Sequence, residues 1–114
     1  MSYQTLLIER EGRVATLTMN RPDRMNSFDS VMRAELPLAW EELAEDESVW
    51  AVVLTGSGGR AFSAGMDLRE PRASDSGDSG AKKEGRTRIT SIDCAVGKPV
   101  VAAVNGVCAG GGLA

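Results

Sequence analysis

The chain has 114 residues, of which 42% are hydrophobic and 25% charged, as in an ordinary soluble globular protein of one domain. Its formal net charge is −3 and its basic residues are scattered, so we expect no nucleic acid partner. No apolar run approaches the about 20 residues that span a bilayer, and the N-terminus lacks the features of a signal peptide. We therefore expect a cytoplasmic protein with no membrane partner.

The residue types that are missing narrow the possible chemistry. The sequence contains no histidine, which excludes Ser-His and Cys-His nucleophile pairs and all histidine-containing metal sites from these residues. Cys94 and Cys108 lack the CxxC spacing of a structural zinc site, so we expect no metal. Both lie in apolar surroundings, which favours buried free thiols over a disulfide. Any general acid or base here must be Asp, Glu, Lys, Tyr or Cys.

The first part of the chain predicts a β-hairpin. Residues 5–9 and 14–19 alternate and are rich in β-branched or aliphatic side chains, and Glu11, Gly12 and Arg13 between them suit a tight turn. The second strand ends at residues 20–23, because Pro22 biases the preceding residue toward extended geometry and Asn and Asp favour turns.

An amphipathic helix is predicted over residues 30–44. Asp29 or Ser30 suits its N-cap, and Pro37 should kink it. We expect Trp50, beyond this helix, to lie in the core together with Met32 and Trp40 of the helix. The apolar residues at helical spacing are Met32, Leu36, Ala39, Trp40 and Leu43.

The second part of the chain predicts two apolar strands. Residues 49–55 suggest a strand buried on both faces beside a parallel neighbour, with helices packed outside. Residues 70–88 contain almost nothing apolar and predict a mobile surface loop. Residues 89–96 partly restore a helical pattern, and residues 99–104 form the last predicted strand, which we expect to be buried.

A glycine-containing stretch follows each of these strands, at residues 59–68 and 105–112. Glycine allows positive φ and close approach of backbone N–H groups to a ligand. If neighbouring parallel strands deliver both stretches to one edge of a sheet, a ligand site is expected there, and two convergent N–H donors make an oxyanion hole. Taken alone, the glycine triplet at residues 110–112 favours an ordinary flexible turn, because glycine clusters are common in loops.

Three blocks resemble the enoyl-CoA hydratase/isomerase (crotonase) superfamily in their order and spacing: residues 17–28, residues 53–56 with 60–68, and residues 103–106 with 110–112. The resemblance runs from about Tyr3 to Ala114. It implies an α/β protein with a crotonase-like (ClpP/crotonase) superhelix of ββα turns. The later turns and the C-terminal helices of that fold are not in this sequence, so residues 1–114 are expected to be the N-terminal part of a longer parent that forms a homotrimer or hexamer.

The resemblance also implies acyl-CoA thioester chemistry, with coenzyme A as part of the substrate and no separate cofactor. By motif, the backbone N–H groups of Met66 and Gly111 would hold the negative charge that develops on the thioester oxygen. The residues that match the acyl-CoA groove are Ala64, Asp67 and Leu68, and those that match a segment near the nucleotide end of coenzyme A are Arg24, Met25 and Asn26. A turn that merely starts the following helix explains the last three equally well.

Ala114 departs from the pattern of the hydratases in the resembled family. Their glutamate at this position helps to activate the water that is added across the double bond, and alanine offers no proton transfer. A parent with a single later acid could instead shift a double bond, and other members of the resembled family hydrolyse, decarboxylate or dehalogenate thioesters. Two alternatives to an enzyme remain open at this stage: a non-catalytic acyl-CoA binding module and an inactive truncated fragment.

Overall fold

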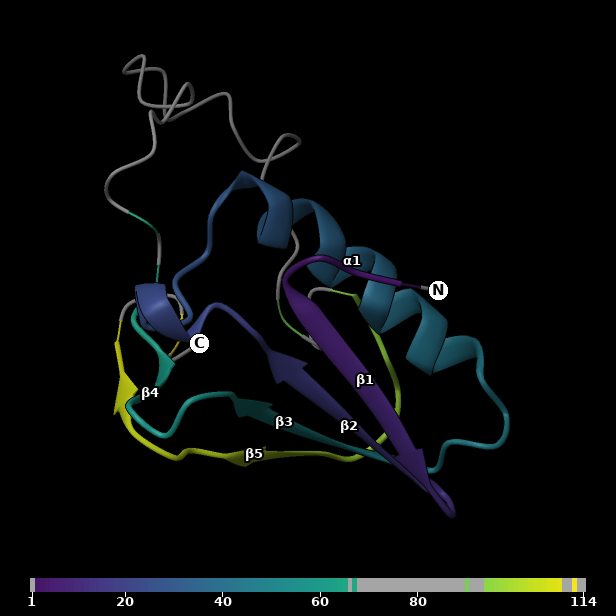
Figure 1. Ribbon diagram of the computed structural model, residues 1–114. Helices are drawn as coiled ribbons and strands as arrows, with labels where there is room; N and C mark the ends of the chain where they lie inside the picture. The colour runs from purple at the N-terminus through teal and green to yellow at the C-terminus, as the bar shows by residue number, and fades with distance from the viewer. Residues whose placement is uncertain (1, 66, 68–89, 91–93, 110–111, 113–114) are drawn as a thin grey trace.

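The computed structural model describes residues 2–65, 67, 90, 94–109 and 112. A four-stranded sheet of order β1-β2-β3-β5 carries one long helix, α1, on one of its faces (Figure 1). A second sheet of two short strands, β4 and β6, lies beyond the ends of β3 and β5 (Figure 1). The predicted α/β class is confirmed.

The N-terminal hairpin forms as predicted. β1 (Leu6–Glu11) pairs antiparallel with β2 (Val14–Met19), so that Leu6 lies opposite Met19. The turn between them contains Gly12 at φ 63°, a left-handed conformation that favours glycine. The pattern that predicted the hairpin is local, and the structure only lengthens the first strand slightly.

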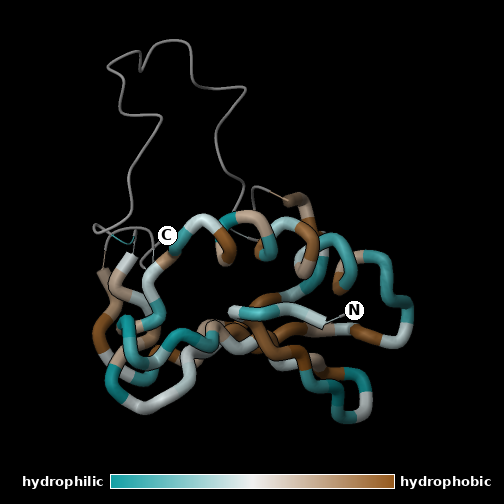
Figure 2. Tube along the Cα trace, turned by 45° about the horizontal axis from the view of Figure 1, so that its top comes forward, coloured by the Kyte–Doolittle hydropathy of each residue, from teal (hydrophilic) through white to brown (hydrophobic). Residues whose placement is uncertain are grey.

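Helix α1 (Ser30–Glu45) follows a short 3-10 helix, η1 (Pro22–Arg24). Asp29 is the N-cap, and its side chain accepts a hydrogen bond of 2.8 Å from the backbone N–H of Met32. The helix continues through Pro37. Figure 2 shows brown, hydrophobic segments both along the helix and in the sheet below it, interspersed with hydrophilic ones. The buried helix residues are the five that the spacing predicted: Met32, Leu36, Ala39, Trp40 and Leu43.

The central strand β3 (Ala51–Gly56) is parallel to β2 on one side and to β5 (Val100–Ala103) on the other. The predicted parallel neighbour is confirmed, but burial of both faces is wrong. Val52 is fully buried, whereas Val101 is 60% exposed and Trp50 is 63% exposed, with the guanidinium of Arg13 4.7 Å from its ring centre. Within the described residues α1 covers only one face of the sheet, so side chains on the other face remain accessible.

Two further expectations concern the segment between β4 and β5. The predicted mobile loop, residues 70–88, lies outside the described residues, as does half of the helical pattern at 89–96. In the described part, Cys94 donates its backbone N–H to the carbonyl of Thr90 at 3.1 Å. Cys94 and Cys108 are free thiols, as predicted.

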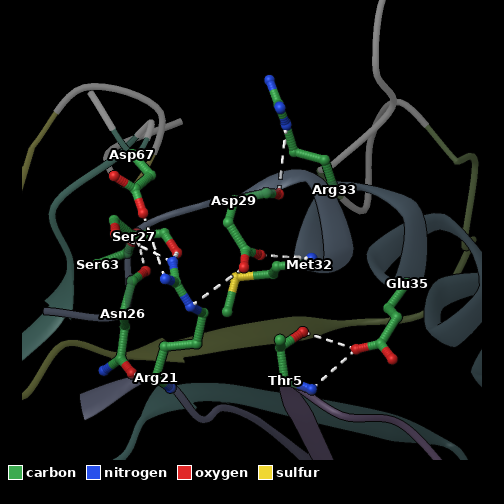
Figure 3. Close-up of polar contacts among 10 residues, drawn as sticks. All are labelled: Thr5, Arg21, Asn26, Ser27, Asp29, Met32, Arg33, Glu35, Ser63 and Asp67. Carbon is green, nitrogen blue, oxygen red and sulfur yellow. Dashed lines mark hydrogen bonds and ion pairs between the residues drawn. The ribbon is translucent and has the colours of Figure 1, made fainter. Parts of the chain in front are cut away.

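The carboxylate of Glu35 ties the N-terminal segment to α1. It accepts a hydrogen bond from the N–H of Gln4 at 2.7 Å. It also accepts bonds from the N–H and the hydroxyl of Thr5, at 2.9 and 2.6 Å (Figure 3). Burial by itself would raise the pKa of Glu35, but these bonds to its charged form together outweigh it and lower the pKa. The ionised carboxylate therefore stabilises the fold.

We expect this contribution to be complete above the unfolded-state pKa of the carboxyl, about 4.5, and to be lost as pH falls through the lower folded-state pKa. Urea unfolding from about pH 6 to about pH 3 should thus show a steeper loss of stability in the unmodified chain than in Glu35→Gln. Glu41→Gln, at an exposed position of the same helix, is the control and should keep the steep loss. Equal slopes for all three proteins would contradict this prediction.

Candidate active site

Two short parallel strands bring the two glycine-containing stretches together. β4 (Ala61–Ser63) and β6 (Val107–Cys108) pair in parallel, with Ser63 opposite Cys108. Beyond this pair, Ala109 donates its N–H to the carbonyl of Ser63 at 3.1 Å. The carboxyl ends of both strands therefore point to the same edge, as predicted for a ligand site. The strands concerned are β4 and β6 rather than the longer β3 and β5.

Gly112 shows why a glycine is needed at this edge. A Cβ atom on Gly112 would lie 2.8 Å from the Cβ of Ser63 and closer still to the carbonyl oxygen of Ser63. The N–H of Gly112 donates to the carbonyl of Ala109 at 2.8 Å, and its own carbonyl accepts a bond from the Cys108 thiol. The second glycine stretch is thus in close backbone contact with the end of β4.

The loop after β4 is held by the segment just before α1. Phe28 donates its N–H to the carbonyl of Gly65 at 2.7 Å and accepts a bond from the N–H of Asp67 at 3.0 Å. Ala64 donates its N–H to the carbonyl of Met25 at 3.0 Å. These bonds join two of the predicted site segments into one backbone arrangement.

Asn26 lies at the centre of this arrangement and has no exposed surface. Its side-chain oxygen accepts the N–H of Arg21 at 2.8 Å, and its amide nitrogen donates to the carbonyls of Ser57 and Ala61 at 3.1 and 2.9 Å. Its own carbonyl accepts the hydroxyl of Ser63 at 2.8 Å (Figure 3). Asn26 has φ 52°, a left-handed conformation that Asn tolerates better than most residues. Any contribution of Asn26 to ligand binding would be indirect.

Arg21 bridges the start of α1 and the loop after β4 (Figure 3). Its Nη2 lies 3.2 Å from Asp67 Oδ2 and its Nε lies 3.5 Å from Asp29 Oδ2. Its Nη1 donates to the carbonyl of Ser27 at 2.5 Å and to the hydroxyl of Ser27 at 3.2 Å. One guanidinium group therefore contacts three residues from two parts of the site.

The predicted site residues differ in how far the structure describes them. Met66, Gly111 and Leu68 lie outside the described residues. Arg24 is exposed at the end of η1. The others among the described residues are Met25, Ala64 and Asp67, which are half-buried, and Asn26, which is buried. Met25, Asn26, Ala64 and Asp67 belong to the connected arrangement around Ser63 and Phe28, while contact of any of them with coenzyme A stays a prediction.

Sequence reasoning missed Arg21 and Ser63, which connect the site segments. The sequence pattern identifies Arg21 only as part of the turn that ends β2, and Ser63 only as a member of a glycine-containing loop. The signal for the bridge from Arg21 to Asp29 and Asp67 is weak: the sequence shows only a charged residue beside a proline turn and two aspartates further along the chain. Their partners are too distant in sequence for spacing alone to identify.

The described residues contain neither a metal-binding cluster nor a membrane-spanning helix. None of them form a group of three or more His, Cys, Asp or Glu side chains that could hold a metal ion. Within that same part of the chain, none of the helices is both long and apolar enough to cross a membrane.

Comparison with known proteins identifies the fold and the family. A family profile described as Enoyl-CoA hydratase/isomerase matches residues 9–114. The chain belongs to the enoyl-CoA hydratase/isomerase family. It is 39% identical over 114 residues to a "Probable enoyl-CoA hydratase" of Rhizobium meliloti, a match that covers 98% of this chain and 42% of the relative. It is 36% identical over 118 residues to the short-chain-enoyl-CoA hydratase of Clostridium acetobutylicum, covering 98% and 43%.

Solved structures of the enoyl-CoA hydratase/isomerase family share the same backbone arrangement. A crystal structure of an enoyl-CoA hydratase/isomerase from Mycobacterium paratuberculosis superposes with a TM-score of 0.79 at 35% identity, covering 99% of this chain and 42% of that one. The crotonase-like fold class is therefore confirmed. The chain spans less than half the length of these relatives, so the activity of a whole protein is a matter for proposal.

Proposed function

We propose that this chain forms the thioester-binding part of an acyl-CoA enzyme in which the backbone N–H groups of Met66 and Gly111 stabilise an enolate oxygen. The observation that carries the proposal is that both loops meet at Ser63. Its carbonyl accepts a hydrogen bond from the N–H of Ala109, and its hydroxyl oxygen accepts one from the N–H of Gly65. Met66 and Gly111 are near neighbours in sequence of Gly65 and Ala109. Backbone donors neither ionise nor rotate away, which suits them to a developing oxyanion.

The acyl-CoA substrate is proposed to lie along the residues that the motifs identified. Ala64, Asp67 and Leu68 would line the acyl groove, and the exposed Arg24 at the end of η1 would meet the nucleotide end of coenzyme A, with Met25 and Asn26 shaping that segment. The names of the relatives support this substrate class. No separate cofactor is proposed, and assembly into trimers or hexamers is proposed for a whole protein.

Ala114 bears on which reaction the site would support. Alanine cannot activate water, so a hydration that depends on a carboxylate at this position is disfavoured, and a double-bond shift that uses one acid elsewhere is compatible. The same residue favours the second candidate, an acyl-CoA binding module without turnover. Calorimetric titration of the chain with butyryl-CoA tests the binding that both candidate functions require. If no binding is detected, both candidate functions are excluded for this chain.

Replacing Gly111 with proline removes one of the two proposed N–H donors and should lower turnover by about 10²- to 10³-fold. Turnover is measured in a chimera that joins residues 1–114 to the remaining part of the Rhizobium meliloti relative. Both hydration of a 2-enoyl-CoA and isomerisation of a 3-enoyl-CoA are followed by the absorbance of the conjugated thioester.

The matched control for this substitution is Gly111→Ala, which keeps the N–H group. We expect it to retain much more activity than Gly111→Pro, while circular dichroism verifies that both chimeras are folded. Undiminished turnover in a folded Gly111→Pro chimera would remove Gly111 from the mechanism.

A further inference from the structure

We propose that Arg21 is a positioning residue for the thioester-binding loop, defined here as Ala64, Gly65 and Asp67, which flank Met66 in the chain. The proposal rests on the function proposed above, and it adds a side chain that the motifs did not assign to the site. The carrying observation is that the guanidinium of Arg21 contacts Asp67 of this loop and Asp29 of α1 at the same time.

Asp29 is the fixed end of this bridge. Its Oδ1 caps α1 through the N–H of Met32, and the helix is anchored in the core by its buried apolar face. Asp67 is the end that needs positioning, because it belongs to a loop rather than to a helix or strand. Arg21 therefore transmits the position of the helix to the loop.

The residue of the loop that Arg21 contacts, Asp67, directly follows Met66 in the chain, and Gly65 directly precedes it. The carbonyl of Gly65 and the N–H of Asp67 are both bonded to the backbone of Phe28, at 2.7 and 3.0 Å. The Arg21–Asp67 ion pair holds the side chain of Asp67, the residue whose N–H is bonded to Phe28. A weaker bridge should loosen this part of the loop and with it the direction of a nearby N–H donor.

Burial makes the bridge depend on the charge of Arg21. Relative side-chain exposures are 15% for Arg21, 15% for Asp29 and 10% for Asp67, so solvent screens their interaction much less than on the surface. Removing the cation would take a positive charge away from two carboxylates that are both largely buried, which is costly. Lysine would restore the charge without the planar fork that reaches several acceptors at once, so Arg21→Lys should rescue only in part.

Arg10 provides a matched control. It also bridges two carboxylates, with Nη2 3.0 Å from Glu42 Oε2 and Nε 2.9 Å from Asp46 Oδ2. Its side chain is more exposed, at 38%, and its partners lie in and just beyond the C-terminal part of α1. Arg10→Met therefore removes a similar ion-pair pattern without touching the proposed loop.

The first experiment measures amide hydrogen exchange by NMR on the 114-residue chain. In Arg21→Met we expect the Asp67 amide to exchange about tenfold faster or more, while amides of β2 change by less than about twofold. Arg21→Lys should lie between, and Arg10→Met should leave Asp67 unchanged. A general loss of stability would instead accelerate both groups of amides together.

The second experiment compares the affinities of the same chains for butyryl-CoA and S-butyl-CoA, a thioether without the carbonyl oxygen. Unmodified chain should prefer the thioester, and Arg21→Met should lower this preference about tenfold with little change in thioether binding. If the role of Arg21 were merely structural, Arg21→Met would lower the affinity for both ligands by the same factor.

The outcomes separate the two proposals. Faster hydrogen exchange in Arg21→Met that is confined to the Asp67 amide, together with a lost preference for the thioester, supports the positioning role. Unchanged exchange at Asp67, or a thioester preference that survives in Arg21→Met, overturns it while leaving the proposed function intact. If the unmodified chain shows no thioester preference, the proposed function fails, and the role of Arg21 in thioester binding fails with it.

Discussion

Replacing Asn26 with alanine is expected to lower the free energy of unfolding by about 3 kcal/mol or more. The side chain satisfies three backbone groups, the N–H of Arg21 and the carbonyls of Ser57 and Ala61, in a place without exposed surface. Each group left unpaired in such a place costs about 1–3 kcal/mol. Alanine at φ 52° adds backbone strain of about 1 kcal/mol.

Urea unfolding of a short series separates these causes. Asn26→Gly removes the hydrogen bonds but tolerates positive φ, so it should be less destabilising than Asn26→Ala. Asn26→Asp keeps an acceptor for the Arg21 N–H but loses both donors. The control is Asn105→Ala, which removes a single bond, to the carbonyl of Gly56, at an exposed residue and should cost no more than about 1 kcal/mol. An effect at Asn26 no larger than at Asn105 would show that the three bonds are not what holds this region.

Replacing Gly112 with alanine is expected to separate the two loops of the proposed site. The new methyl group would lie 2.8 Å from the Cβ of Ser63, and overpacking of this kind typically costs about 1–3 kcal/mol. Ser63 has little freedom to move away, because its hydroxyl is bonded to the carbonyl of Asn26 and its carbonyl to the N–H of Ala109. The relief must come from a shift of a loop.

Such a shift should lower the affinity for butyryl-CoA about tenfold or more in calorimetric titration, since oriented donors lose their effect when misplaced by about 1 Å. Gly12→Ala is the control. Gly12 lies in the β1–β2 turn with no atom within 4 Å of the added Cβ, so that variant carries backbone strain alone and should bind as the unmodified chain does. Wild-type affinity in Gly112→Ala would mean that the contact with Ser63 does not control the site.

The sequence predicted best where the determining contacts are local. Alternation and a glycine turn predicted the β1–β2 hairpin, and apolar spacing with an aspartate cap predicted α1 and all five of its buried residues. The motifs also predicted that two glycine-containing stretches meet, and the pairing of β4 with β6 confirms it. The hairpin and α1 depend on residues that are close in the chain, whereas the meeting of the two stretches joins Ala61 to the distant Val107 and was expected only from the motifs.

Other features could not be derived from pattern. β4 and β6 have three and two residues, too few for alternation to distinguish them from loops. The exposure of Trp50 and Val101 was mispredicted because burial depends on whether another element covers that face of the sheet, which a strand's own composition does not state.

The sequence by itself determined the family, the hairpin, the helix and the positions of the two glycine-containing stretches. Only the tertiary structure decided that Asn26 is a buried hydrogen-bonding centre and that Arg21 joins Asp29 to Asp67. The physical reason is sequence separation. Asp67 lies 46 residues beyond Arg21, and such partners meet only after the sheet and helix have packed and fixed the directions of their side chains.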